Sequence, residues 1–549
     1  MTLQQQIILQ AIAQKIKDRA GLHALKQSVY SAGKKNQPSN QLLLKEYRKL
    51  LQKKKIAANP ILEKILKTRE IRTLSGVAVI TVLTKPYPCP GACIYCPSVP
   101  TMPKSYLPDE PAAARALSLK FNPHAQVKQR IEMLKINGHD TDKIELIVKG
   151  GTWSAYPRKY QDWFIKRCFE AANNIKTQGH KNIKTRTLEE AQKVNETTKH
   201  RIIGLTLELR PDSVTPEEIK HLRQLGCTRI EMGVQTIDDK ILKLIQRGHT
   251  AGQVAEATQM LRDAGFKVDY HLMPALPGVS LKKDLKNFKK IFTDSRFRPD
   301  MIKIYPCSVI PGTKLYKLWK NKNYTPPTME QLLNLIIKMK LVVPRYVRIS
   351  RIIRDIPGPN IAAGNKVTSL RQNIQAEMMK QGLHCKCIRC REIGHQRQLR
   401  ITNYELLITN YRTLGGREYF LSIENPKRDA LFAFCRLRLP NVESSTLNIL
   451  PELKNAALIR ELHTYGHLVP IESRLKGASR PRRISDDLYK AQHLGSGKQL
   501  IKEAEKISKK AGYKKMAVIS GIGAREYYKK LGYRLNGNYM VKTLQRRTT

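Results

Sequence analysis

The sequence lacks any apolar run long enough to cross a membrane, and it is poor in aromatic and acidic residues. No apolar stretch approaches the ~20 residues that a transmembrane helix needs. The N-terminus has neither the basic start nor the apolar core of a signal peptide. We therefore expect a cytoplasmic protein without a membrane partner. Aromatic residues make up only 6% of the chain, so a large stacking platform for single-stranded nucleic acid is not evident.

The shortage of acidic residues leaves a large positive charge. The 99 Lys and Arg residues stand against 45 Asp and Glu residues, which gives a formal net charge of +54. Such a field favours a polyanionic partner, and nucleic acid is the first choice. The alternative is a lysine-rich host whose proteins are all basic. At 549 residues with 41% apolar content, the chain exceeds a single core and should form about two or three domains.

Three of the ten cysteines form a compact motif, Cys89, Cys93 and Cys96, directly after the apolar run 76–84. That run reads as a buried parallel strand, so the cysteines lie at its carboxyl end, where α/β folds place their chemistry. Three thiolates can bind three irons of a 4Fe–4S cluster and leave the fourth iron open, which favours catalysis over electron transfer. Zinc is the alternative, but a structural zinc site requires four ligands. We favour the cluster, which also implies a reducing compartment.

Residues 73–370 alternate apolar strands with amphipathic helices. Repeated βα units of this kind predict a parallel sheet or a partial barrel. The expected helices are 216–225, 238–246, 251–264 and 281–292, and segment 176–200 reads as a surface helix with a loop. The expected strands are 76–84, 144–148, 202–209, 229–234, 268–273 and 301–305.

The cysteine spacing resembles the signature of the radical S-adenosylmethionine (SAM) enzymes. Gly150 and Gly151, which end the second strand, resemble the glycine motif that contacts the methionine part of SAM in that family. Glycines permit close backbone approach, although a Gly-Gly pair is often only a turn. Further candidates for SAM or substrate contacts, each of which could instead be a structural ion pair, are Glu208, Arg210, Glu231 and Gln235. His271 is left unassigned.

A second cysteine motif, Cys385, Cys387 and Cys390, lies in a predicted junction at residues 371–392. Its spacing favours a structural zinc site, with a second iron–sulfur cluster or unliganded thiols as alternatives. The fourth ligand would be Cys307 or His384, with Cys307 preferred. Three further cysteines in apolar surroundings read as packing residues, namely Cys168, Cys227 and Cys435.

Two segments carry locally concentrated basic residues. Residues 1–72 hold 16 Lys and Arg against 4 Asp and Glu, and their helical periodicity predicts a small basic helical module. Lys53, Lys54 and Lys55 should bind RNA phosphates, although a solvated helix face is the alternative. Further along the chain, a basic strip beside the active site should also face RNA, and it consists of Arg348, Arg351 and Arg354.

Residues 393–549 are predicted to form a separate domain, which begins with two antiparallel strands followed by a third strand. The loop Gln492 to Lys498, with Gly495, Ser496 and Gly497 at its centre, then opens a helix. A helix N-terminus with flexible glycines can bind phosphate groups through free backbone amides. The loop and the order of elements resemble the pyrophosphate-binding region of the GCN5-related N-acetyltransferase (GNAT) fold.

The whole chain resembles the catalytic subunit of the Elongator complex and its stand-alone prokaryotic relatives. The motifs that carry the resemblance include 89–97, 229–235, 297–300, 303–306, 354–357, 460–463, 492–493 and 517–521. It implies a radical SAM partial (β/α) barrel joined to a GNAT-type α+β acetyltransferase domain, with the helical module in front. It also implies that the enzyme forms 5-carboxymethyluridine at the wobble position of transfer RNA, using a SAM-derived radical and acetyl-CoA.

The same resemblance implies residue roles at the acetyl-CoA end. The acetyl-CoA contacts would be Lys143, Glu461, Leu462, His463, Thr464, Gln492, Gly495, Ser496, Gly497, Lys498 and Tyr528. The catalytic residues would be Lys143, His463, Tyr527 and Tyr528. Two alternatives stay open: a protein lysine acetyltransferase, and a transfer RNA-binding scaffold with a structural cluster. The enzyme would act alone or as a homodimer, and no sequence motif indicates its electron donor.

Overall fold

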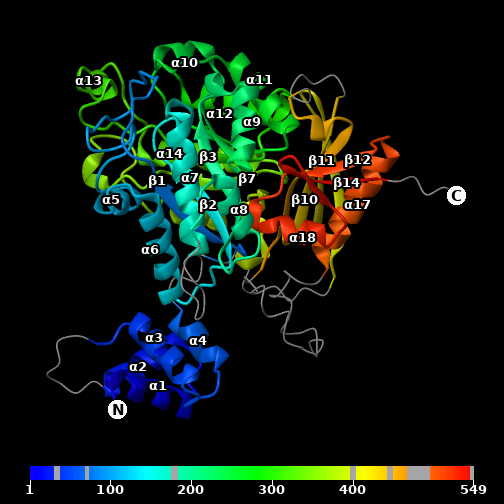
Figure 1. Ribbon diagram of the computed structural model, residues 1–549. Helices are drawn as coiled ribbons and strands as arrows, with labels where there is room; N and C mark the ends of the chain where they lie inside the picture. The colour runs from blue at the N-terminus through cyan, green and yellow to red at the C-terminus, as the bar shows by residue number, and fades with distance from the viewer. Residues whose placement is uncertain are drawn as a thin grey trace.

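The computed structural model describes residues 1–29, 37–67, 73, 75–174, 184–395, 403–441, 449–466 and 495–544. In chain order these residues build a helical unit, a sheet of parallel strands surrounded by helices, and a second sheet of mixed direction (Figure 1). Within these ranges, no helix is both long and apolar enough to cross a membrane.

The first unit consists of four short helices, shown in blue at the bottom of Figure 1: α1 (Leu3–Ala13), α2 (Arg19–Val29), α3 (Asn40–Gln52) and α4 (Pro60–Leu66). Apolar residues at helical spacing form a small core of their own, with Leu43 and Tyr47 fully buried. The unit contacts the next one through Gln41, whose side-chain amide donates a hydrogen bond of 2.7 Å to the Asn137 side chain. The prediction of a helical N-terminal module is consistent with this arrangement.

The second unit is a half-barrel of seven parallel strands. The strands pair in the order in which they occur, while β1 and β7 do not pair, so the barrel stays open along one side. Its strands are β1 (Ala78–Leu83), β2 (Lys143–Lys149), β3 (Arg201–Leu209), β4 (Arg229–Gln235), β5 (Lys267–Leu272), β6 (Met301–Ile304) and β7 (Arg348–Ile352). The prediction of a partial barrel is confirmed.

Helices connect the strands and cover the outside of the half-barrel (Figure 1). They are α5 (Pro111–Ser118), α6 (Pro123–Ile136), α7 (Arg158–Asn173), α8 (Leu188–Asn195), α9 (Pro216–Gln224), α10 (Asp239–Leu244), α11 (Ala251–Asp263), α12 (Leu281–Thr293), α13 (Lys314–Lys320) and α14 (Met329–Val342). Six strands were expected from the sequence within a few residues of their observed bounds. Strand β7 was missed because its two arginines broke the apolar pattern.

The third unit is a seven-stranded sheet with the order β13-β14-β12-β11-β10-β9-β8. Only β11 and β12 run parallel, and the other pairs are antiparallel. Its strands are β8 (Glu405–Thr413), β9 (Gly416–Glu424), β10 (Leu431–Pro440), β11 (Ala456–Thr464), β12 (Lys515–Val518), β13 (Arg534–Asn536) and β14 (Tyr539–Thr543). Helices α17 (Ser496–Lys510) and α18 (Arg525–Lys529) complete it. Strands β8, β13 and β14 were not expected. Most residues of β8 and β13 are exposed, so these two strands lack a buried apolar run.

The third unit packs against the N-terminal ends of the barrel strands. Gly521 follows β12 and lies so close to the Ile203 carbonyl near the start of β3 that a side chain would overlap it. On the neighbouring strand β11, His463 Nε2 donates a 2.8 Å hydrogen bond to the Ser75 carbonyl, just before β1. The three-cysteine loop follows β1, so it lies at the opposite, C-terminal end of the barrel.

Candidate active site

The three-cysteine loop brings the Cys89 and Cys93 thiols within electrostatic range of Cys96. Cys89, Cys93 and Cys96 are each partly exposed. Burial, together with the charges that Cys93 and Cys89 would carry, raises the pKa of the Cys96 thiol to about 11. The Cys89 sulfur lies 3.5 Å from the Thr152 hydroxyl, which follows β2. Three neighbouring thiols at the end of a barrel strand are a suitable ligand set for a metal cluster with an open position.

Gly150 joins the ends of β1 and β2. Its φ angle is +147°, and a Cβ atom there would overlap the Thr84 hydroxyl at the end of β1. Only glycine fits this close approach. Gly151, by contrast, has only the Tyr156 hydroxyl near its Cβ position, at 3.8 Å. The first glycine is therefore required by packing, and the second leaves backbone open beside the cysteine loop.

The interior of the barrel carries a compact network of charged residues from five strands. Lys149 forms an ion pair with Glu231, and its ammonium lies 3.2 Å from Glu208. Lys303 lies 2.5 Å from the same Glu231 oxygen, and His271 contacts Glu231 at 3.0 Å and Glu208 at 3.4 Å. The carboxylates of Glu208 and Glu231 and the imidazole of His271 lie close enough together to hold a metal ion. Two ammonium groups already occupy the carboxylates, so a cation is disfavoured there.

Burial changes the protonation of this network. It lowers the pKa of Lys149 to about 7 and, with the charge of Lys303, the pKa of His271 to about 4. Burial alone would raise the pKa of Glu208, but the charge of Lys149 and a hydrogen bond from His271 hold it well below its usual range. The network thus contains an ionised carboxylate, a neutral imidazole and one lysine that exchanges a proton near neutral pH. The apolar pattern of the strands indicated neither Lys149 nor Lys303 as site residues.

One cavity of about 1070 Å³ runs through the barrel and reaches the third unit. Alternate residues of β2, from Lys143 at its start to Lys149 at its end, line the cavity along the whole strand. Cys96 lines one end, and Gly497 and Tyr528 line the other. The predicted site residues that line it are Cys96, Lys143, Glu208, Glu231, Gln235, Arg348, Arg351, Arg354, Glu461, Leu462, His463, Thr464, Gly495, Gly497, Lys498, Tyr527 and Tyr528.

Other predicted residues lie outside the cavity lining. Arg210 lies behind the cysteine loop and forms an ion pair of 2.9 Å with Asp212. Ser496 opens α17 but does not face the cavity. Gln492 falls outside the described residues.

The far end of the cavity is built from β11 and the start of α17. Gly495 precedes the helix with a φ angle of +85°, a left-handed conformation that glycine adopts without strain. A Cβ atom on Gly497 would come within 2.8 Å of the Tyr527 hydroxyl, so the helix start and α18 are in close contact. Burial lowers the pKa of His463 and raises that of Tyr528. Both groups are therefore neutral at physiological pH.

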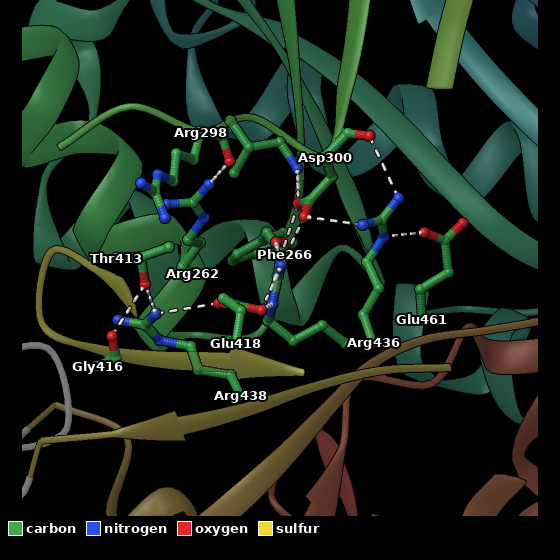
Figure 2. A network of polar contacts seen from close by, with 12 residues as sticks. Arg262, Phe266, Arg298, Asp300, Thr413, Gly416, Glu418, Arg436, Arg438 and Glu461 are labelled. Carbon is green, nitrogen blue, oxygen red and sulfur yellow. Dashed lines mark hydrogen bonds and ion pairs between the residues drawn. The ribbon is translucent and has the colours of Figure 1, made fainter. Parts of the chain in front are cut away.

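A buried ion network fixes this end against the barrel (Figure 2). Asp300, which precedes β6, receives two hydrogen bonds of 2.6 and 2.8 Å from Arg460 of β11. Arg436 of β10 contacts Asp300 and donates a 2.8 Å hydrogen bond to Glu461, which lines the cavity. Glu418 binds Arg460 and Arg438 at 2.9 and 3.0 Å. Charges from both units thus interlock where the cavity crosses between them.

Known proteins are similar to this chain over most of its length. The radical SAM superfamily model matches residues 87–289, and the Radical_SAM C-terminal domain model matches residues 299–380. The tRNA uridine(34) acetyltransferase of Methanocaldococcus infernus is 45% identical over 502 residues, covering 88% of this chain and 89% of that protein. Elongator complex protein 3 of Homo sapiens is 38% identical over 515 residues, covering 91% and 88%. The chain belongs to the Elongator complex protein 3 family.

A solved structure supports the placement in this family. The archaeal Methanocaldococcus infernus Elp3 with an N-terminal deletion superposes with a TM-score of 0.71 at 42% identity, covering 86% of this chain and all of that one. Radical SAM domains hold a 4Fe–4S cluster and SAM, and the residues present fit both groups. The three thiols are a suitable set of cluster ligands, and the open backbone at Gly151 leaves space beside them.

The second cysteine motif of this Elongator family member is brought together by the fold. The sulfurs of Cys385, Cys387 and Cys390 lie within 4.8 Å of one another. Burial would raise the pKa of the Cys387 thiol, but hydrogen bonds from the other two hold it well below its usual range. A thiolate among close thiols has the chemistry of a metal ligand.

The prediction of Cys307 as the fourth ligand is wrong. Cys307 follows β6 at the C-terminal end of the barrel, where its thiol is buried and hydrogen-bonded to the Tyr324 side chain. The cysteine motif lies at the opposite end, because the Ile388 amide donates to the Val347 carbonyl just before β7. Successive parallel strands point the same way, so a residue after β6 and one before β7 are a strand length apart. His384 is also outside the group, with its ring bonded to the Gly382 carbonyl at 3.1 Å.

The predicted RNA-binding residues of the family member fall into two groups. Lys53, Lys54 and Lys55 follow α3 and are exposed. Arg348 is largely buried and pairs with Glu392 at 2.6 Å. The other two arginines of the predicted strip are also paired, Arg354 with Glu110 at 2.8 Å and Arg351 with Asp355. The arginine spacing did not reveal these partners, and all three line the cavity rather than an outer face.

Proposed function

We propose that this chain modifies the wobble uridine of transfer RNA by attaching a carboxymethyl group, derived from acetyl-CoA, to carbon five of the base. Relatives in Methanocaldococcus infernus and Dehalococcoides mccartyi, at 45% and 43% identity, carry the name tRNA uridine(34) acetyltransferase. The observation that carries the proposal is the single cavity that joins Cys96 to Gly497 and Tyr528. The two cofactor loops are far apart in the sequence, but both would open into this one cavity.

When bound, the cluster and SAM would supply a radical able to take a hydrogen atom from the acetyl methyl group. Bond formation between that methyl carbon and carbon five of the uridine would release the C5 hydrogen as a proton and return one electron to the oxidised cluster. Hydrolysis of the thioester by water would then release coenzyme A and leave the carboxymethyl group. The barrel walls exclude water from this chemistry. Lys149, with a pKa near 7, exchanges a proton inside the barrel, and the neutral His271 beside it holds Glu208 in place.

Acetyl-CoA is bound at the end of the cavity formed by β11 and α17. The Lys498 amide donates to the Gly495 carbonyl, so the backbone amides available for the coenzyme phosphates at the start of α17 are those of Ser496 and Gly497, and the Lys498 side chain adds a positive charge. Thr464 and Lys143 lie along the path toward the barrel interior and line the same cavity. A coenzyme bound there would extend its thioester into the cavity rather than toward bulk solvent.

We infer a structural zinc ion at Cys385, Cys387 and Cys390. Three close thiols, one of them held as a thiolate, match three of the four ligands of such a site. The site ties α16 (Ile388–Arg391) to the start of β7 and thereby braces the junction between the two sheets. Its fourth ligand is an exogenous group or a residue outside the described ranges.

The RNA partner is bound through phosphate contacts. The net charge of +54 and the exposed Lys53, Lys54 and Lys55 provide the sequence-independent part of the affinity. The helical unit that carries these lysines contacts the barrel near the start of β2, at the same end as the third unit. A transfer RNA held there would have its anticodon loop near the cavity.

One assay tests the proposal. Reduced protein with a reconstituted cluster is incubated with SAM, acetyl-CoA and transfer RNA, and the RNA is digested and searched for 5-carboxymethyluridine by mass spectrometry. We expect the modified base with the native chain and none with Cys93→Ala. Absence of product from protein with an intact cluster and bound RNA would refute the proposal. Lysine acetylation that persists in Cys93→Ala, without an RNA product from either protein, would favour the acetyltransferase alternative.

A further inference from the structure

A buried guanidinium contacts one of the three cluster cysteines. Arg247 follows α10, and its Nη1 donates a hydrogen bond of 3.4 Å to the Cys93 sulfur. Its Nε and Nη2 both donate to the Gly233 carbonyl, at 3.1 and 2.6 Å. A Cβ atom on Gly233 would overlap this guanidinium, so the glycine leaves the space that Arg247 fills. Three hydrogen bonds and close packing hold the side chain in a single orientation toward Cys93.

A second guanidinium lies beside the first. Arg210 is 4% exposed, and its Nη2 donates to Asp212 at 2.9 Å and to the Arg247 carbonyl at 2.7 Å. Its Nη1 is buried and has no hydrogen-bond partner among the described residues. A Cβ atom on Gly91, inside the cysteine loop, would overlap that Nη1. An unsatisfied buried donor is costly, so this N–H points at a place where an acceptor belongs.

The charges around these groups leave one buried cation uncompensated. Asp212 forms an ion pair with Arg210. Burial, followed by the charge of Arg247, lowers the pKa of His249 to about 3, so the imidazole next to Arg247 is neutral. Arg247 therefore carries the net positive charge on this side of the cysteine loop.

We propose that Arg247, supported by Arg210, is a positioning residue that raises the reduction potential of the iron–sulfur cluster through Cys93. The three thiolates make the cluster anionic, and reduction adds another negative charge. A buried cation and an N–H···S hydrogen bond stabilise the reduced form more than the oxidised form. Reduction is the event that makes SAM cleavage accessible, so this pair of arginines would set how strong a reductant the enzyme requires. The inference rests on the proposed function only for the presence of the cluster.

The test is a redox titration of the reconstituted protein, followed by electron paramagnetic resonance, without RNA or acetyl-CoA. We expect Arg247→Gln to lower the midpoint potential, and to reduce the ratio of reduced to oxidised cluster at a fixed potential on the order of tenfold. Arg247→Lys keeps the charge and should shift the potential less. Arg223→Gln, which removes another buried guanidinium from the outer helix α9, should not shift it.

The outcomes separate a redox role from a merely structural one. An unchanged midpoint in Arg247→Gln at full iron content overturns the proposal. If Arg247→Gln does not retain iron, Arg210→Gln provides the same test, because it leaves Asp212 unpaired near the loop and should also lower the potential. An unchanged midpoint in that variant would equally overturn the proposal. Because neither measurement involves RNA, failure of the proposed function would leave these results unaffected.

Discussion

Replacing Asp300 by asparagine removes the negative charge that lies between Arg436 and Arg460. All three side chains are essentially inaccessible to solvent, so the two guanidinium groups would remain buried without their shared counter-ion. Loss of one partner of a buried ion pair costs about 3–5 kcal/mol. For a domain of the size of the third unit, this loss should decrease the melting temperature by on the order of 10 °C. The measurement is differential scanning calorimetry of the native chain and Asp300→Asn.

A matched control is available on the surface nearby. Asp294 pairs with Arg296 at 2.7 Å, and the arginine side chain is 51% exposed. Exposed pairs contribute about 0–1 kcal/mol, so Asp294→Asn should shift the melting temperature by no more than a few degrees. If Asp300→Asn destabilises the chain no more than Asp294→Asn, the interlocked charges in Figure 2 do not hold the two units together.

The same carboxylate should make stability depend on pH. Burial would raise the pKa of Asp300, but the charges of Arg460 and Arg436 hold it well below its usual value. The unfolded chain therefore binds this proton before the folded chain does, and the stabilisation is lost as the pH falls below about 4. In acid titrations of the melting temperature, we expect a shallower decline for Asp300→Asn than for the native chain. Parallel curves would contradict this assignment.

Four further changes give distinct outcomes. Gly150→Ala forces a Cβ atom onto the Thr84 hydroxyl, so SAM binding measured by calorimetry should fall at least about tenfold. Lys149→Met should remove a titration near pH 7 from the pH profile of SAM cleavage. A profile that keeps this titration would show that another group causes it. Cys387→Ser should abolish bound zinc, measured by elemental analysis, while the iron content stays the same. Exchange of all three lysines of 53–55 for serine should reduce the salt slope of transfer RNA binding by about three, and an unchanged slope would exclude phosphate contacts there.

The sequence predicted the architecture where local patterns carry it. The apolar runs that end at Gly150 and at Glu208 marked strands, and the cysteine spacing marked the cluster loop. It failed at β7, because Arg348 forms its ion pair with Glu392, 44 residues later in the chain. A single chain has no local signal for a partner at that distance, so a buried arginine reads as a surface one.

Prediction of the site residues from the sequence was limited in the same way. Glu208 and Glu231 were recognised as polar residues on otherwise apolar strands, but Lys149 and Lys303 were not, because lysine at a strand end is ordinary. The choice of Cys307 failed because cysteine spacing contains no information about which end of the barrel a residue occupies. Parallel strand direction, once known, settles that question at once.

The central claim is that the cluster loop and the acetyl-CoA loop serve one cavity. The most direct test supplies the reduced enzyme with SAM, transfer RNA and acetyl-CoA that is deuterated at its methyl group, and measures the mass of the 5′-deoxyadenosine formed. A shared cavity predicts that deuterium appears in the 5′-deoxyadenosine. Unlabelled 5′-deoxyadenosine, formed alongside the modified uridine, would contradict it.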